Sequence, residues 1–114
     1  GAVAASNYLV TLLAYAIRHF AALGADPNQA LRAVLPLVRG TLDNVERLGI
    51  PRALTGPIAR GDVATVAGHL AALRLRAPQL LELYRLLARE TVPLARQRGG
   101  PAAEAAEEIL RIVR

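Results

Sequence analysis

The sequence of 114 residues contains no cysteine, methionine or tryptophan, and all of its basic residues are arginine. Without cysteine the chain cannot form disulfides, thiolate metal sites or thiol nucleophiles. Without lysine it lacks the amine that Schiff-base chemistry needs. The two histidines have no dense group of carboxylates around them in the sequence, so we expect no metal site.

Aromatic residues are also scarce, at 4%, although 54% of the residues are hydrophobic. Alanine and leucine supply most of this apolar content, and β-branched residues are few. This usage favours helices over strands and is too apolar for a disordered chain. The sequence therefore predicts an all-α fold, with residues 1–114 forming a single domain of about five helices.

The net charge of +5 is spread evenly along the chain. No block of arginines occurs, and the few aromatic residues do not alternate with arginine as stacking platforms for bases do. We therefore expect no nucleic-acid partner.

The most apolar segment lies at the N-terminal end, from Ala2 to Ile17, and is interrupted by Ser6, Asn7 and Thr11. It is shorter than the roughly 20 residues of a membrane span, and it lacks the basic start and cleavage site of a signal peptide. We expect a buried helix, no membrane partner and a cytoplasmic protein. Because this helical pattern begins without a cap residue, the chain is also expected to be a fragment of a longer protein.

Caps and helix-breaking residues divide the chain into five expected helices, at 2–23, 27–48, 63–75, 78–96 and 101–113. Asp26 and Asp62 are expected N-caps, and Gly24 is the expected C-terminal residue of the first helix. Pro36 predicts a kink or a short break within its helix, and Pro93 predicts a bend near the end of its helix. Residues 49–62, rich in glycine and proline, are the least regular part of the chain.

Two groups of polar residues are candidates for a site. On the first helix, Asn7 and Thr11 share a stripe with Arg18, and they either line a pocket or bond to a neighbouring loop. The second group follows the irregular segment and comprises Thr55, Gly56, Arg60, Thr65 and His69. Glycines that permit close backbone approach, an arginine fork and a helix N-terminus together suit a carboxylate or phosphate.

Within the second group, Asp62 is expected to act mainly as the helix cap. His69 is a candidate general acid or base, although no carboxylate stands three or four residues away to orient it. His19 lies near a helix end, where we expect a structural role.

Three segments resemble one known family: Ala-Ala-Ser-Asn-Tyr-Leu-Val at 4–10, Leu-Pro-Leu with Gly-Thr-Leu at 35–42, and Leu-Thr-Gly-Pro-Ile-Ala-Arg-Gly-Asp with Thr-Val and His-Leu at 54–70. They are similar to the C-terminal half of Rossmann-type oxidoreductases that carry the domain of unknown function 2520. Those proteins resemble pyrroline-5-carboxylate reductase, ketopantoate reductase and the 6-phosphogluconate-dehydrogenase-like group. The resemblance covers residues 3–96.

The resemblance implies a helical domain that dimerises and closes the substrate cleft of a preceding dinucleotide-binding domain, which this chain lacks. It implies that Asn7, Thr55, Gly56 and Arg60 face the nicotinamide and the substrate. The parent protein would use NAD or NADP, whereas this chain by itself would bind no cofactor and be non-catalytic. Since lysine is absent, the lysine-dependent mechanism of several relatives cannot operate here.

A second interpretation assigns the chain to a different functional class. The chain could be a free-standing helical interaction module whose loop binds a small anion or a partner protein. A strand followed by a Gly-x-Gly-x-x-Gly turn upstream in the parent reading frame distinguishes the two.

Overall fold

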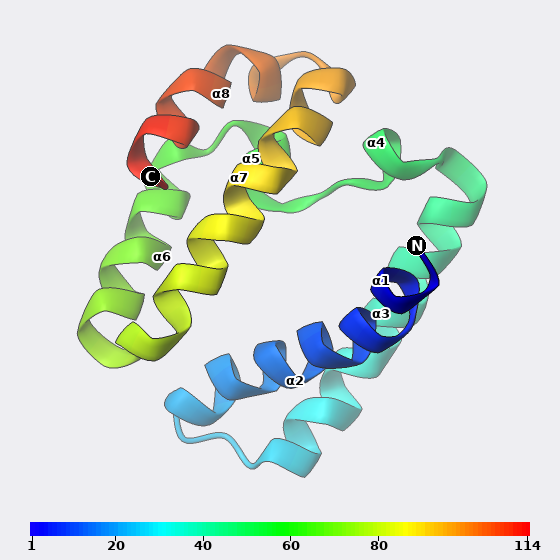
Figure 1. Ribbon diagram of the computed structural model, residues 1–114, viewed down its shortest axis with the longest axis vertical. Helices are drawn as coiled ribbons and strands as arrows, with labels where there is room; N and C mark the ends of the chain where they lie inside the picture. Colours follow the sequence, from blue (N-terminus) through cyan, green and yellow to red (C-terminus); the bar gives the residue numbers. More distant parts are fainter. The chain divides into compact units, whose positions relative to one another are not determined.

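The computed structural model describes residues 1–114 and contains helices but no strand, which confirms the all-α prediction (Figure 1). The elements are α1 (Ala2–Ala5), α2 (Asn7–Ala22), α3 (Pro27–Leu48), α4 (Ile50–Ala53), α5 (Gly56–Arg60), α6 (Val63–Arg76), the 3-10 helix η1 (Pro78–Leu80), α7 (Leu81–Arg98) and α8 (Pro101–Ile112). None of the helices combines the length and the apolar character that a membrane crossing requires.

The five long helices correspond to the five that the sequence predicts. At the majority of helix ends, the predicted and observed bounds differ by two residues or fewer. The first prediction is wrong at Ser6, where a turn separates α1 from α2. The segment 49–62 is also more regular than predicted, because it forms the two short helices α4 and α5. Glycines with positive φ at residues 49, 56 and 61 set the limits of these short helices.

No break occurs at Pro36 or Pro93, since α3 and α7 continue through both prolines. A proline removes one backbone hydrogen bond, and the remaining turns of a long helix can still hold it together. The chain divides into two compact units, Gly1–Gly40 and Thr41–Arg114, with the boundary inside α3.

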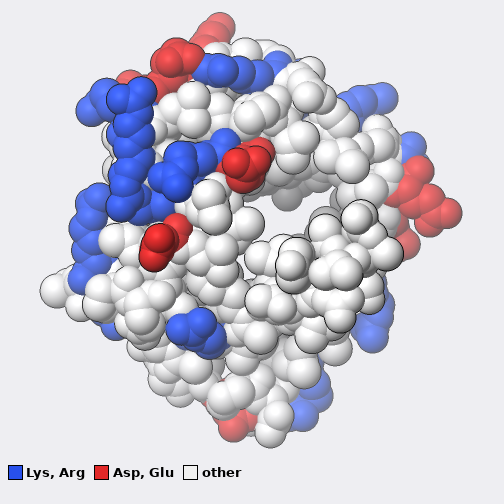
Figure 2. Space-filling view, viewed as in Figure 1, with Lys and Arg blue, Asp and Glu red and all other residues white.

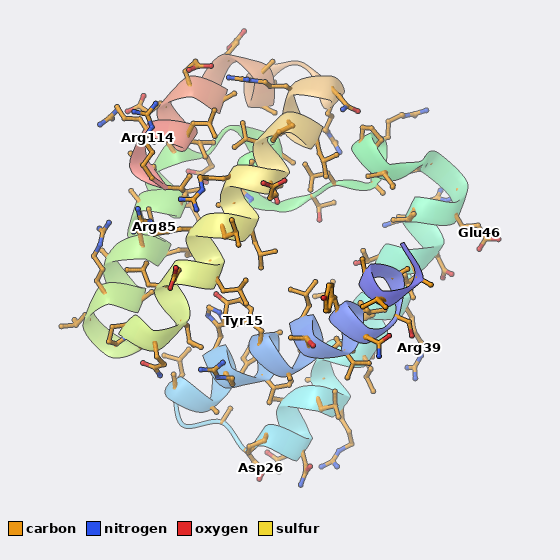
Figure 3. All side chains as sticks on the ribbon, in the orientation of Figure 1. Tyr15, Asp26, Arg39, Glu46, Arg85 and Arg114 are labelled. Carbon is orange, nitrogen blue, oxygen red and sulfur yellow. The ribbon has the colours of Figure 1, made fainter.

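The first unit consists of α1, α2 and the first part of α3. Asp26, labelled at the α2–α3 turn in Figure 3, accepts a hydrogen bond from the backbone N–H of Gln29 at 3.0 Å. This confirms the predicted cap of α3. The turn begins with Gly24 at a φ of +91°, the predicted left-handed end of α2.

The apolar first helix is not buried as the sequence predicts. Only Tyr15 and Ala30 are buried in the first unit, since two long helices offer each other a single contact face. Large apolar side chains of this unit are exposed: Val3, Tyr8, Val10, Leu12, Phe20, Leu23, Leu31 and Leu37. The surface over α1 and α2 that faces the viewer in Figure 2 is correspondingly mostly uncharged.

The second unit contains the hydrophobic core, where α6, α7 and α8 pack on one another and α5 packs against all three. The core residues are Val66, Leu70, Ala88, Val92, Ala106, Ile109 and Val113. Alanines on α7 and α8 bring these two helices close together. The leucine spacing over 78–96 predicts four inward leucines: Leu80, Leu83, Leu87 and Leu94. Leu80 in η1 is buried as predicted, whereas the three leucines of α7 are half-buried. The buried residues of α7 are Ala88, Val92 and Ala95.

Arginines of α7 connect the helices of the second unit. Arg85 Nε and Arg89 both donate to the backbone carbonyl of Val113 at 3.1 Å and are half-buried at the end of α8. The helical spacing of the charged residues alone would place both arginines on the outward face of α7. Figure 3 shows Arg85 on the side of α7 where Arg114 lies. Arg98 donates to the carbonyls of Arg52 and Leu54 and thereby ties the segment after α4 to the end of α7.

Candidate functional site

The start of α6 is fixed by the carboxylate of Asp62. One oxygen accepts the backbone N–H of Thr65 at 3.0 Å, and the other accepts the Thr65 hydroxyl at 2.6 Å. The N-cap prediction is therefore confirmed. These bonds from Thr65, hydroxyl first and backbone second, lower the pKa of Asp62 below its usual 3.8, and the nearby charges of Arg60 and His69 act in the same direction.

Arg60 ends α5 and lies beside this cap. Its guanidinium is 3.9 Å from the Asp62 carboxylate, and its side chain remains 62% exposed. At this separation and exposure the ion pair is weak. Most of the donors of Arg60 therefore remain available to an anion from solution.

Gly61 makes the tight turn from α5 into α6. Its φ is +67°, and a Cβ at this position would run into the backbone carbonyl of Pro101 and lie 3.1 Å from the Cβ of Ala105. Only glycine fits both the conformation and the space. The turn thus places Gly61 directly against the start of α8.

His69 lies two turns further along α6, on the same face as Asp62 and Thr65. Its Nδ1 is 2.9 Å from the hydroxyl of Tyr84 on α7, and the two rings meet edge to face with centroids 5.9 Å apart. His69 is exposed, whereas Tyr84 is half-buried and packs against the core. Tyr84 is therefore the partner that orients the imidazole.

The remaining predicted residues of the loop lie at the start of α5. Thr55 is exposed and precedes the helix in an extended conformation, and its side chain makes no capping hydrogen bond. Gly56 has a φ of +89° and open space where a Cβ would lie. These two residues and the Arg60 cluster sit at opposite ends of one five-residue helix.

The candidate residues of the first unit make their contacts within α2. Thr11 donates to the backbone carbonyl of Asn7 at 3.3 Å within α2, and both residues are exposed. Arg18 is exposed on the same helix. His19 stands edge-on to Tyr15, with ring centroids 4.5 Å apart.

Sequence reasoning missed Tyr84, the orienting partner of His69. Its position among the leucines of α7 marks it as a core residue, and the sequence carries no signal that its hydroxyl reaches another helix. It likewise missed Arg98, which appears on α7 as an ordinary surface charge. Both contacts join residues that lie far apart in the chain.

The second-unit cluster offers hydrogen-bond donors rather than a nucleophile. The guanidinium of Arg60 and the imidazole of His69 are exposed at the α5–α6 turn and along α6, whereas the Thr65 hydroxyl donates to Asp62. No group of three or more histidine, cysteine or acidic side chains could hold a metal ion, and every buried side-chain polar atom has a partner. Such a cluster can bind and polarise an oxygen-bearing molecule.

A family model described as a domain of unknown function (DUF2520) matches residues 1–91. No curated protein and no solved structure matches the chain.

Proposed function

The chain belongs to the family of the domain of unknown function 2520, and from this premise we propose that it is the helical dimerisation and substrate-side domain of a Rossmann-type NAD(P)-dependent oxidoreductase. By itself the domain is inactive. The observation that carries this proposal is the cluster of Arg60, Thr65 and His69 beside the Asp62 cap. The exposed guanidinium of Arg60 and imidazole of His69 are suited to the substrate side of a cleft, and Thr65 holds the Asp62 carboxylate beside them.

The residues of this chain do not fit a dinucleotide. Pyrophosphate binding in Rossmann-type proteins uses a glycine-rich turn between a strand and a helix, and the chain contains neither a strand nor that sequence pattern. The nucleotide therefore belongs to another domain of the proposed parent. The contribution of this chain is to bind and orient the substrate and to exclude water.

The proposed role of Arg60 is to bind an anionic group of the substrate. Its guanidinium is planar, exposed and only weakly paired, which suits a carboxylate or phosphate. Thr55 and Gly56 are proposed to line the same cleft from the other end of α5.

Dimerisation is proposed to occur through the first unit. Eight large apolar side chains of this unit are exposed, and exposed apolar patches on a protein mark interaction surfaces. A second copy of the chain would cover these side chains through a two-fold axis.

Two measurements test the proposal. We expect the full-length parent to bind NADH or NADPH in a calorimetric titration, and the 114-residue chain to bind neither. Micromolar binding of either nucleotide by the chain alone contradicts the assignment.

In the parent, Arg60→Ala should weaken the affinity for an anionic substrate by about 1.5–3 kcal/mol, the range for a hydrogen bond to a charged group. Arg111→Ala is a matched control, because its side chain is similarly exposed at 65% but lies on α8. A large fall in melting temperature with unchanged substrate affinity would assign Arg60 a structural role instead.

The exposed apolar surface also supports a second candidate, a free-standing interaction module that binds a partner protein. The two candidates differ in what the complete reading frame encodes. A dinucleotide-binding unit upstream supports the oxidoreductase domain, and its absence supports the interaction module.

A further inference from the structure

A single nitrogen of Arg98 bonds two backbone carbonyls at the end of α4. Arg98 lies in the last turn of α7, and its Nη1 donates to the carbonyl of Arg52 at 3.0 Å and to the carbonyl of Leu54. These partners are 46 and 44 residues away in the chain. The two bonds therefore join the end of α7 to the segment that leads into α5.

The segment between α4 and α5 has few contacts of its own to fix it. Only Leu54 and Thr55 separate the two helices, and α4 is too short to be stable by itself. The side chain of Thr55 makes no capping hydrogen bond. The backbone bond from the N–H of Leu54 to the carbonyl of Pro51 is long, at 3.4 Å. Since the Leu54 carbonyl directly precedes Thr55, Arg98 acts at the start of the loop that carries Thr55 and Gly56.

An arginine is well suited to this position. The carbonyls at a helix end lack intrahelical donors, and a positive charge is favourable in the last turn of α7. A guanidinium nitrogen presents two N–H groups in a fixed plane, one for each carbonyl. Arg98 forms none of the ion pairs of the chain, so its guanidinium serves the backbone.

The far end of α5 is fixed independently of Arg98. Gly61 lies directly against the backbone of Pro101, and Ala59 is buried. Arg98 therefore acts on the start of α5 alone. Its loss should release segment 54–56 and leave the α5–α6 turn in place.

We propose that Arg98 is a positioning residue, which holds Thr55 and Gly56 on the substrate side of the cleft through the carbonyls of Arg52 and Leu54. The cleft itself rests on the proposed function. The effect of Arg98 on segment 54–56 does not, because it follows from contacts within the second unit.

Backbone ¹⁵N relaxation of the 114-residue chain tests this role. We expect order parameters of about 0.85 at Thr55 and Gly56 in the wild type and values below about 0.6 in Arg98→Met. Methionine has a helix propensity close to that of arginine and keeps an apolar stem, so this variant removes the donors and preserves α7. The order parameter of Thr65, whose N–H bonds to Asp62, should stay unchanged.

Two further variants separate the hydrogen bonds from a general effect on α7. Arg96→Met is the matched control, because Arg96 lies in the same last turn but pairs with Glu107, and it should leave the loop as ordered as in the wild type. Arg98→Lys restores a cationic donor and should raise the order parameters of Thr55 and Gly56 above those of Arg98→Met.

A folded Arg98→Met protein with wild-type order at Thr55 and Gly56 overturns the proposal, and so does a wild type in which both residues are already mobile. A loss of order that extends to Thr65, or that Arg96→Met reproduces, overturns the positioning role because it shows a general loosening. Failure of lysine to improve on methionine also contradicts the role of the donated hydrogen bonds.

In the full-length parent, Arg98→Met should leave the Kd for NADH or NADPH unchanged, since the nucleotide belongs to another domain of the proposed parent. A changed Kd contradicts a local role for Arg98. A parent that binds neither nucleotide contradicts the proposed function alone, and the order parameters of the 114-residue chain still decide whether Arg98 holds segment 54–56.

Discussion

At the scale of single residues, Asp62 combines a structural and an electrostatic role. Its carboxylate caps α6 through Thr65, and these hydrogen bonds lower its pKa from 3.8. A carboxylate with a lowered folded pKa stabilises the folded state fully above its unfolded pKa. This contribution is lost as the pH falls through the lower folded value.

Asp62→Ala should therefore lower the melting temperature at pH 7, and the difference from the wild type should shrink below about pH 4. Thermal unfolding followed by circular dichroism between pH 7 and pH 2.5 measures this. Asp62→Asn serves as the control, because asparagine still caps a helix but carries no titrating charge. A difference that stays constant over the whole pH range would contradict the prediction.

At Gly61, both the positive φ and the lack of space for a Cβ require glycine. Gly61→Ala should destabilise the chain by about 2–5 kcal/mol, the sum of a left-handed backbone penalty and overpacking against Pro101. Gly56→Ala is matched to it, since its φ is +89° but open space surrounds the added methyl, and only about 1–2 kcal/mol should be lost. If urea unfolding shows the same loss of stability for both variants, the close approach to Pro101 does not contribute to the destabilisation.

Local pattern was enough to predict the residue-scale features that depend on neighbours in the chain. Asp62 and Asp26 cap helices because they stand at the right distance from a helical run, which the sequence displays directly. Tyr84 could not be found in this way, because its bond to His69 depends on how α6 and α7 pack.

At the scale of elements, α6 contains a glycine that its helix does not require. Nothing lies within 4 Å of the position where a Cβ of Gly68 would be. Gly68→Ala should therefore stabilise the chain by about 0.5–1 kcal/mol, because glycine costs more conformational entropy in a helix than alanine.

Urea denaturation with an unchanged slope measures this gain. Loss of stability in Gly68→Ala would show instead that another surface approaches α6 at this point.

The long helices were predictable because the residues that cap or end each helix lie next to it in the sequence. Proline at the first turn and glycine after the last turn mark both ends of α3, Pro27–Leu48. The short helices α4 and α5 were not predictable, since four or five residues are too few for a helix to be stable by itself. Contacts of α4 with α7, and of α5 with α6, α7 and α8, stabilise them.

At the scale of the whole molecule, the proposed dimer makes a prediction about mass. Light scattering should find a species near twice 12.1 kDa that persists in high salt, because aliphatic burial rather than charge holds it. The interface should exceed about 1,600 Å² in total. A monodisperse monomer at micromolar concentration would refute the dimer.

A pair of variants locates the interface. Val10→Glu places a charge on α2, where the side chain is 66% exposed, and should produce a monomer. Leu75→Glu is the control, because Leu75 is even more exposed, at 81%, but lies on α6 in the second unit. Dissociation by Leu75→Glu with no effect of Val10→Glu would move the interface away from the first unit.

The sequence by itself determined the helical class, the five long helices and the caps, because helix propensity and capping act over a few neighbouring residues. It also marked Arg60, Thr65 and His69 as site candidates, since their spacing places them along the α5–α6 turn and one face of α6. Only the tertiary structure decided that Tyr84 contacts His69, that Arg98 holds the segment after α4, and that apolar side chains of α2 such as Val10 and Phe20 are exposed. These outcomes depend on which helix faces pack together, and packing joins residues that no local pattern relates.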